Sequence, residues 1–193
     1  MDGPSFGDVL ERGPLRLRPM RRRDEREWRE LRARNADWLR PWEATPPAGG
    51  EALGFGALVR LERRQRRERS ALGLVMEVDG ALAGRVVLAG IEWGAQRSAM
   101  LGYWIDRDLA GRALAPRAAA MICAHGFDLG LHRIELATRP DNSASRRVAQ
   151  KLGFTSEGVR RRYLHVDGQW RDHEVFARIA DEPRIGPFWD PGS

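Results

Sequence analysis

Cysteine, lysine and long apolar runs are all scarce in this chain of 193 residues. A single cysteine, Cys123, excludes an internal disulfide and any zinc site built from several cysteines. Its place inside a predicted helix favours a role in the core over one as a nucleophile. No apolar run approaches the ~20 residues of a membrane-spanning helix. The first residues lack the basic and apolar layout of a signal peptide, so we expect a cytoplasmic protein with no membrane contact.

Lysine occurs once, at Lys151, and arginine supplies the rest of the 33 basic residues, which outnumber 27 acidic ones. The formal net charge is +6. Such a surface is either simply solvated or attracts polyanions such as a cofactor's phosphates or an RNA-rich partner. The basic residues are spread out and no stacking aromatic motif accompanies them, which argues against sequence-specific binding of nucleic acid.

The length is typical of one domain. We expect a flexible leader over residues 1–13, a folded domain over 14–180 and a proline-rich tail over 181–193 that forms no regular structure. Trp189 in this tail could pack against the body or against a second subunit of a homodimer.

The first half of the domain predicts a strand, a helix and a loop in turn. Leu15 and Leu17 alternate with arginines, as in a short strand. Asp24 and Glu27 fit a capping box at the start of a helix. An aromatic loop over residues 36–50 follows, and residues 51–69 read as a helix whose arginine-rich end is solvated.

Two Asp-Gly pairs predict hairpins, because both positions of a two-residue turn require positive φ. The first pair joins apolar strands over 72–78 and 82–91. The second joins strands over 163–166 and 170–179. Two hairpins and one strand-helix-strand crossover predict an α/β (α+β) fold, with a mixed, mainly antiparallel sheet and helices on both faces.

The stretch from Gly102 to Phe154 carries the strongest functional signal. A strand around 101–105 runs into a Gly/Ala loop over 110–115 and then an apolar helix over 116–129, whose first turn suits Pro116. A small-residue loop before a helix is an anion site, because unpaired N–H groups and the helix dipole point at one spot. A strand over 133–138 and a helix over 142–152 follow. His125, on the apolar stripe of the long helix, reads as a core histidine with a satisfied hydrogen bond.

This order of elements resembles the acetyl-CoA core of the GCN5-related N-acetyltransferase (GNAT) superfamily. Within it, the segments GYWID, LHRIE, RPDNSASRRV and KLGF look like the RimJ/RimL branch, which acetylates the N-termini of ribosomal proteins. The resemblance covers roughly residues 14–180. It implies the acyl-CoA N-acyltransferase fold with splayed central strands, acetyl-CoA as cofactor, and N-acetyltransferase activity without a metal.

The resemblance assigns the cofactor site to a loop, a strand edge and the start of a helix, where Asn142 and Ser145 lie. The loop residues whose N–H groups would hold the diphosphate are Gly111, Arg112, Ala113, Leu114 and Ala115. The strand edge for the pantetheine arm is Tyr103, Trp104 and Ile105. Asn142, which could simply cap a helix, touches pantetheine or substrate in the family. Arg146 and Arg147 could reach phosphates or could face solvent. The family loop has Gln or Arg and then glycine where this chain has Ala110 and Ala113, so cofactor affinity could be reduced.

For catalysis, the resemblance makes Ser145 the proton donor to the leaving thiolate. The glutamate that activates the amine in the RimL-like branch falls, by spacing, on Leu164, which cannot act as a base. His165 is adjacent but faces the other side of a regular strand unless a bulge intervenes. Glu43 on the aromatic loop is the other candidate. Trp38, Trp42 and Glu43 would line the amine's entry, although the tryptophans could equally pack in the core.

A missing base suits one class of acceptor. An α-amine of pKa about 7.7–8.0 is partly neutral near neutral pH, whereas a lysine amine at about 10.4 is almost wholly protonated. This agrees with the acceptor that the resemblance implies, the N-terminus of a ribosomal or other protein, acetylated by direct attack. A small amine such as an antibiotic or amino acid is an alternative. A non-catalytic module that binds CoA or the ribosome is another, favoured by Ala110, Ala113 and Leu164.

Overall fold

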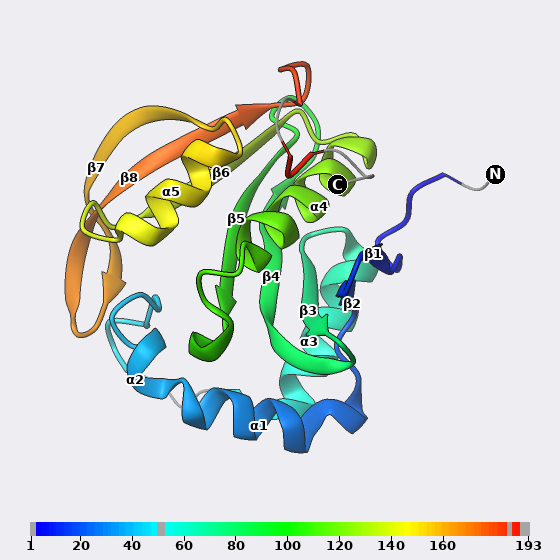
Figure 1. The fold of residues 1–193 in the computed structure, drawn as a ribbon. Coiled ribbons are helices and arrows are strands. Elements are labelled where there is room, and N and C mark those ends of the chain that lie inside the picture. Colours follow the sequence, from blue (N-terminus) through cyan, green and yellow to red (C-terminus); the bar gives the residue numbers. More distant parts are fainter. Residues whose placement is uncertain (1–2, 50–52, 185–186, 190–193) are drawn as a thin grey trace.

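The structure, a computed structural model, describes residues 3–49, 53–184 and 187–189. Its centre is an eight-stranded sheet of order β1-β2-β3-β4-β5-β6-β8-β7 (Figure 1). The strands are β1 (Leu10–Arg12), β2 (Leu15–Arg18), β3 (Leu72–Val78), β4 (Ala81–Glu92), β5 (Ser98–Ile105), β6 (Arg133–Thr138), β7 (Thr155–Val166) and β8 (Gln169–Ile179). Only β5 and β6 pair in parallel, so the predicted mixed, mainly antiparallel sheet is confirmed.

Helices cover both faces of this sheet. They are η1 (Arg22–Asp24), α1 (Glu25–Arg34), α2 (Ala36–Leu39), α3 (Phe55–Glu68), η2 (Arg107–Leu109), α4 (Leu114–Asp128) and α5 (Ser143–Lys151). Because side chains alternate along a strand, Leu74 and Met76 join the core under α4 and α5, whereas Val75 joins the core under α1 and α3. Among the described residues no helix is both long enough and apolar enough to cross a membrane.

Both predicted hairpins are confirmed. Asp79 and Gly80 have φ of 51° and 84°, and Asp167 and Gly168 have φ of 47° and 77°. Other boundaries differ from the prediction. Strand β7 begins at Thr155, eight residues before the predicted start at 163. Residues 155–162 are exposed and mostly polar, so no alternating apolar pattern indicated a strand there. Helix α4 begins two residues earlier than predicted, at Leu114. The start predicted for α3, Glu51, lies outside the described residues.

The two terminal segments are more ordered than the sequence indicates. The expected flexible leader contains β1, which pairs with β2, and Phe6, which is 8% exposed in the main core. The described part of the tail forms no helix or strand, but Trp189 is 9% exposed and stacks on Arg178, with 4.6 Å between guanidinium carbon and ring centre. Trp189 therefore packs against the body of its own chain.

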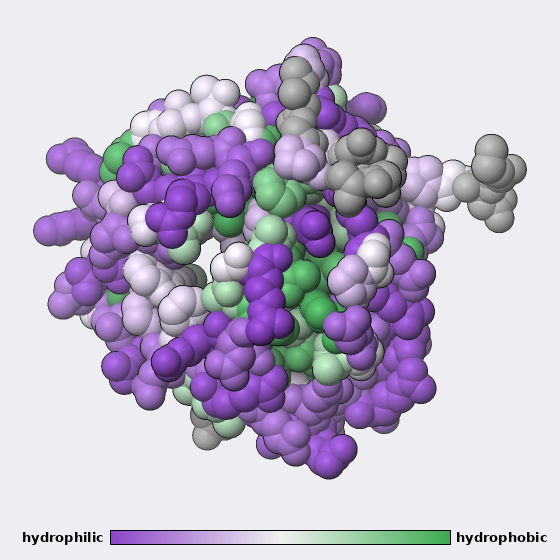
Figure 2. All heavy atoms as spheres, in the orientation of Figure 1, coloured by the Kyte–Doolittle hydropathy of each residue, from purple (hydrophilic) through white to green (hydrophobic). Residues whose placement is uncertain are grey.

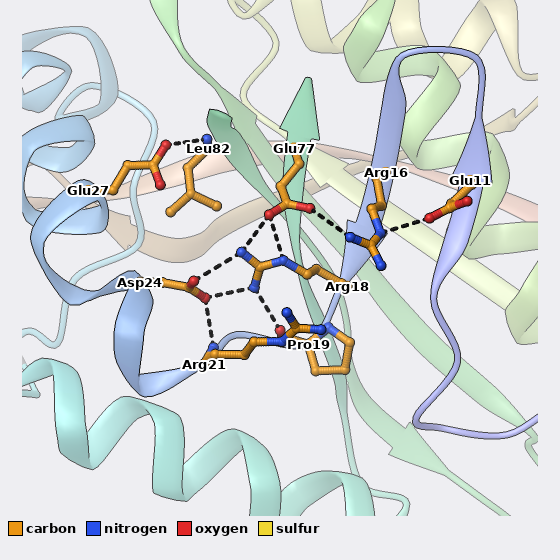
Figure 3. Close-up of polar contacts among 9 residues, drawn as sticks. All are labelled: Glu11, Arg16, Arg18, Pro19, Arg21, Asp24, Glu27, Glu77 and Leu82. Atoms are coloured by element: carbon orange, nitrogen blue, oxygen red, sulfur yellow. Dashed lines mark hydrogen bonds and ion pairs between the residues drawn. The ribbon is translucent and has the colours of Figure 1, made fainter. Parts of the chain in front are cut away.

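The expected capping box at Asp24 is wrong. The Asp24 carboxylate instead accepts the N–H of Arg21 at 2.7 Å and pairs with the buried guanidinium of Arg18 at 2.7 Å (Figure 3). Arg18 also binds Glu77 of β3, so one buried arginine joins β2, β3 and the start of α1. Glu27 accepts the N–H of Leu82 at 2.6 Å. The predicted Asp24–Glu27 pair is therefore not used: Asp24 closes a capping box with Arg21 at η1, and Glu27 binds the backbone of β4.

Candidate acetyl-transfer site

A cavity of about 450 Å³ lies where strand β5 leaves strand β6. These strands pair from Ser98 to Met100, opposite residues 133–135, and among the described residues no strand pairs with residues 101–105 of β5 on that side. The splayed central strands that the resemblance implies are therefore present. Figure 2 shows an opening in the surface at the place where Figure 1 draws this gap. Tyr103, Trp104 and Ile105 line the cavity and offer an extended peptide edge to a ligand.

The loop before α4 forms one end of the cavity. Gly111 has φ of 82° and Ala113 has φ of 60°, both left-handed, and this turns the chain into the helix at Leu114. Among the described residues no group accepts a hydrogen bond from the N–H of Gly111, Arg112 or Ala113. Unpaired N–H groups at a helix N-terminus favour an anion. Gly111, Ala113, Leu114 and Ala115 line the cavity, whereas the exposed side chain of Arg112 lies outside its wall.

Helix α5 forms the facing wall, and its start is fixed locally. The side chain of Asn142 accepts the N–H of Ser145 at 3.0 Å, so the predicted cap is confirmed. The Ser145 hydroxyl lies 3.0 Å from the Tyr103 hydroxyl of β5. Burial raises the pKa of Tyr103 to about 12. Both hydroxyls therefore keep their protons at neutral pH, and the pair can pass a proton to a group in the cavity.

The sequence analysis missed Ala144, Val148 and Lys151, which all line this wall. Arg147, for which it left phosphate contact and solvent exposure open, lies one turn from Lys151 on α5 and lines the cavity too. The i, i+3, i+4, i+7 spacing from Ala144 is the signal that would have found them. Arg146 points elsewhere, because its guanidinium binds Glu174 of β8 at 2.7 Å. Arg147 and Lys151 therefore bring two positive charges to the cavity that the anion-binding loop also lines.

The aromatic loop closes the other end. Trp38 and Trp42 line the cavity and are 40% and 39% exposed, so they are not core residues. The Arg139 guanidinium lies 5.1 Å from the Trp42 ring centre and donates to the carbonyl of Pro41 at 3.0 Å. Glu43 lies outside the cavity wall: its carboxylate pairs with Arg32, with one contact of 2.8 Å.

His165 also lies away from the cavity. Strand β7 does carry an irregularity between Arg160 and Leu164, but beyond it His165 pairs with Trp170. The ring Nδ1 of His165 lies 3.0 Å from the hydroxyl and 3.0 Å from the carbonyl of Thr45. His165 therefore fastens the aromatic loop to the hairpin. No aspartate, glutamate or histidine is among the described residues that line the cavity.

Two residues that the sequence assigned to the core are confirmed there. Cys123 is fully buried, and burial raises the pKa of its thiol well above the usual range. His125 is 7% exposed, and its Nε2 lies 2.9 Å from the Ser5 carbonyl. Among the described residues no group of three histidine, cysteine or acidic side chains could hold a metal ion.

Residues 14–155 match the family model of the acetyltransferase (GNAT) domain. The chain belongs to this family. The uS5-alanine N-acetyltransferase of Escherichia coli K12 is 30% identical over 178 residues, which are 88% of this chain and 87% of that protein. The structure of Mycobacterium smegmatis RimJ with CoA-disulfide is 35% identical, has a TM-score of 0.87, and is matched over 94% of this chain and 91% of that one.

A third relative matches a shorter stretch of this chain. The probable N-acetyltransferase YjcK of Bacillus subtilis is 36% identical over 117 residues, or 60% of this chain. The match spans 65% of that protein's length, slightly less than two thirds. Together these similarities confirm the GNAT fold and the RimJ/RimL resemblance.

Proposed function

We propose that this protein is a cytoplasmic, acetyl-CoA-dependent N-acetyltransferase that acetylates the N-terminal α-amine of a protein, ribosomal or other, by direct attack. The observation that carries the proposal is the cavity itself. It joins an unpaired strand edge, an anion-binding loop and a pair of hydroxyls at Tyr103 and Ser145. The similarity to the uS5-alanine acetyltransferase and to RimJ supports the substrate class.

The residues present fit acetyl-CoA. The free N–H groups of Gly111, Arg112 and Ala113 suit the diphosphate, and Arg147 and Lys151 supply positive charge beside it. The peptide edge of Tyr103–Ile105 suits the amides of the pantetheine arm. When bound, acetyl-CoA supplies an activated thioester carbonyl. The chain's part is to hold that group in line with the amine and to keep a proton ready at Ser145.

Ser145 and Tyr103 would protonate the departing thiolate. A thiol of pKa about 8.5 is a fair leaving group, so the proton gives a modest gain in rate. Tyr103, with its pKa raised to about 12, stays protonated and can restore the proton of Ser145 across their 3.0 Å contact. This arrangement needs neither Glu43 nor His165 in contact with substrate.

The acceptor side favours an α-amine over a polycation. The cavity wall carries no acidic side chain among the described residues, and the nearby carboxylates of Glu43, Asp106 and Asp141 are each paired with an arginine. A polyamine would find no unpaired acidic side chain among these residues to balance its positive charges. An α-amine needs little base, because its pKa of about 7.7–8.0 leaves part of it neutral.

A direct assay would use the full chain, acetyl-CoA, and peptides that begin with Ala or Ser, with free thiol and peptide mass as readouts. We expect thiol release matched by one added acetyl group at the N-terminus. The same peptides with a blocked N-terminus should be inert. Gly111→Val should abolish acetyl-CoA binding measured by calorimetry, because a branched side chain is strained at φ of 82° and would displace the loop from its present conformation.

Two outcomes would replace the proposal. Faster turnover of amino acids, aminoglycosides or spermidine than of any peptide would favour the small-amine acetyltransferase. Tight acetyl-CoA binding with no thiol release from any amine would favour the non-catalytic module, whose supporting features are Ala110, Ala113 and Leu164.

A further inference from the structure

The outer face of helix α3 carries an arginine ridge, made of Arg60, Arg63, Arg64 and Arg67. All four side chains are exposed, and their i, i+3, i+4, i+7 spacing places them on one face of the helix. With Ala57 and Leu61 they border a shallow hollow. The opposite face of α3 is buried through Phe55 and Val59. The ridge is therefore more than the solvated helix end that the sequence predicts, because its charges are lined up on one side.

Little in the described chain neutralises this ridge. Glu62 faces the sheet and binds Arg85 at 2.8 Å, and Glu68 reaches only Arg64, at 3.9 Å. Like charges three and four residues apart destabilise a helix by roughly 0.2–0.5 kcal/mol per pair. The chain accepts this repulsion along about 10 Å of helix, from Arg60 to Arg67. A binding partner that carries several negative charges would relieve it.

We infer that the arginine ridge docks the phosphate backbone of folded RNA. Guanidinium groups bind phosphate through two parallel hydrogen bonds, and a row of them matches a row of phosphates. A membrane surface would require aromatic or aliphatic anchors on the same face. Here only the partly buried Ala57 and Leu61 lie between the arginines. An acidic peptide is the other polyanion that arginine clusters bind, and the test below distinguishes it from RNA with poly-glutamate.

This docking is independent of acetyl transfer. No residue of α3 lines the acetyl-transfer cavity, and α3 covers the opposite sheet face from α4 and α5. Contacts to backbone phosphate carry no sequence information, so the inference agrees with the absence of a sequence-reading motif. Docking of RNA on the ridge would leave the acetyl-transfer cavity open to its substrates.

The test measures binding of the full chain to a fluorescent RNA hairpin by anisotropy, across about 50–200 mM salt. The ridge variant combines Arg60→Glu, Arg63→Glu and Arg67→Glu. The control variant combines Arg26→Glu, Arg97→Glu and Arg161→Glu, three exposed arginines spread over the surface. Each variant changes three charges by two units, so both lower the formal net charge from +6 to zero.

We expect the ridge variant to lose at least tenfold in affinity and about two units of the slope of log affinity against log salt. The control should keep most of that slope. Equal losses in both variants, no binding of the unchanged protein at low salt, or tighter binding of poly-glutamate or anionic vesicles than of RNA would each overturn the inference. Thermal melts verify that both variants fold. Activity on a short peptide should not change in the ridge variant, which separates this test from that of the proposed function.

Discussion

At the scale of single residues, the site depends on a hydroxyl pair more than on a base. Ser145 and Tyr103 come from different elements and meet at 3.0 Å inside the cavity, whereas the two candidate bases are held outside it by Arg32 and Thr45. Under the proposed function, proton delivery to the leaving group is the chemical step in which these side chains would take part. Removal of a proton from the amine would be left to the acceptor's own pKa and to water.

Ser145→Ala should lower kcat by about 10- to 100-fold and leave KM for acetyl-CoA nearly unchanged, because it removes the proton donor without touching the loop. Initial rates of thiol release would measure this. Ser143→Ala is the matched control, since Ser143 opens the same helix but is exposed and outside the cavity wall. An unchanged kcat in Ser145→Ala would remove this residue from the mechanism.

The pH profile of kcat/KM should follow the pKa of the acceptor amine. For a peptide α-amine, kcat/KM should rise about tenfold per pH unit and level off near pH 8, where the neutral amine becomes the major form. For a lysine side chain the same limb should lie more than two units higher. Profiles of kcat/KM against pH for both acceptors, measured with one enzyme preparation, test this expectation. A shared limb near pH 6–7 would instead indicate a base on the enzyme, with His165 the first to examine.

At the scale of elements, the loop that opens α4 carries strain that a glycine would relieve. Ala113 adopts φ of 60°, which costs an L-residue about 1 kcal/mol. We expect Ala113→Gly to bind acetyl-CoA up to about fivefold more tightly, since more of the free loop then has the binding geometry. Ala110→Gly is the control, because Ala110 has φ of −61° and no strain to relieve. Calorimetric titration distinguishes them, and equal affinities in the two variants would contradict the strain argument.

The start of α1 depends on a buried charge network (Figure 3). Burial alone would raise the pKa of Asp24, but hydrogen bonds from Arg18 and from the Arg21 N–H outweigh it and hold the pKa below its usual range. A depressed folded-state pKa means that this stabilisation is present above about pH 4 and is lost as pH falls through the folded-state value.

Asp24→Asn should therefore lower the free energy of unfolding by about 3–5 kcal/mol at neutral pH, because it leaves the Arg18 charge buried with less compensation. The loss should shrink in acid, as the native carboxylate itself becomes protonated. Urea unfolding at both pH values measures this. Glu11→Gln, at the exposed end of the same network, should cost under about 1 kcal/mol. A similar cost for both variants would mean that burial does not set the strength of the network.

What could be predicted from sequence was local. The Asp-Gly turns and the Asn142 cap depend on residues within three positions of each other, and all were predicted correctly. Strand β1 and the first eight residues of β7 were missed, because their order comes from pairing with β2 and β8 and not from an apolar pattern. Asp24 was misread for the same reason: its partner, Arg18, lies on another element. In the site, the sequence could not show that Arg32 and Thr45 hold Glu43 and His165 away from the cavity.

At the scale of the whole molecule, the two ends of the chain close the main core together. The guanidinium of Arg12, next to the start of β2, donates to the Phe188 carbonyl at 2.6 Å, and Trp189 fills the space beside Arg178. Phe188 also lies 6.0 Å from the Lys151 ammonium, which lines the cavity. The described part of the tail thus packs on the domain and reaches Lys151 at the cavity wall.

Trp189→Ala should lower the free energy of unfolding by about 3–5 kcal/mol, because it empties a large, nearly buried site. Trp170→Ala, in a side chain that is 53% exposed, should cost under about 1 kcal/mol. Urea denaturation curves at one temperature compare the two, provided that their slopes agree. If Trp189→Ala unfolds at the same midpoint as the unchanged protein, the tail is not part of the folded unit.

Strands β5 and β6 share only three residue pairs before they separate. Under the proposed function, the thioester would lie in this gap, and an acceptor would have to insert only the end of its chain. The enzyme would then accept a protein whose remainder is already folded or assembled.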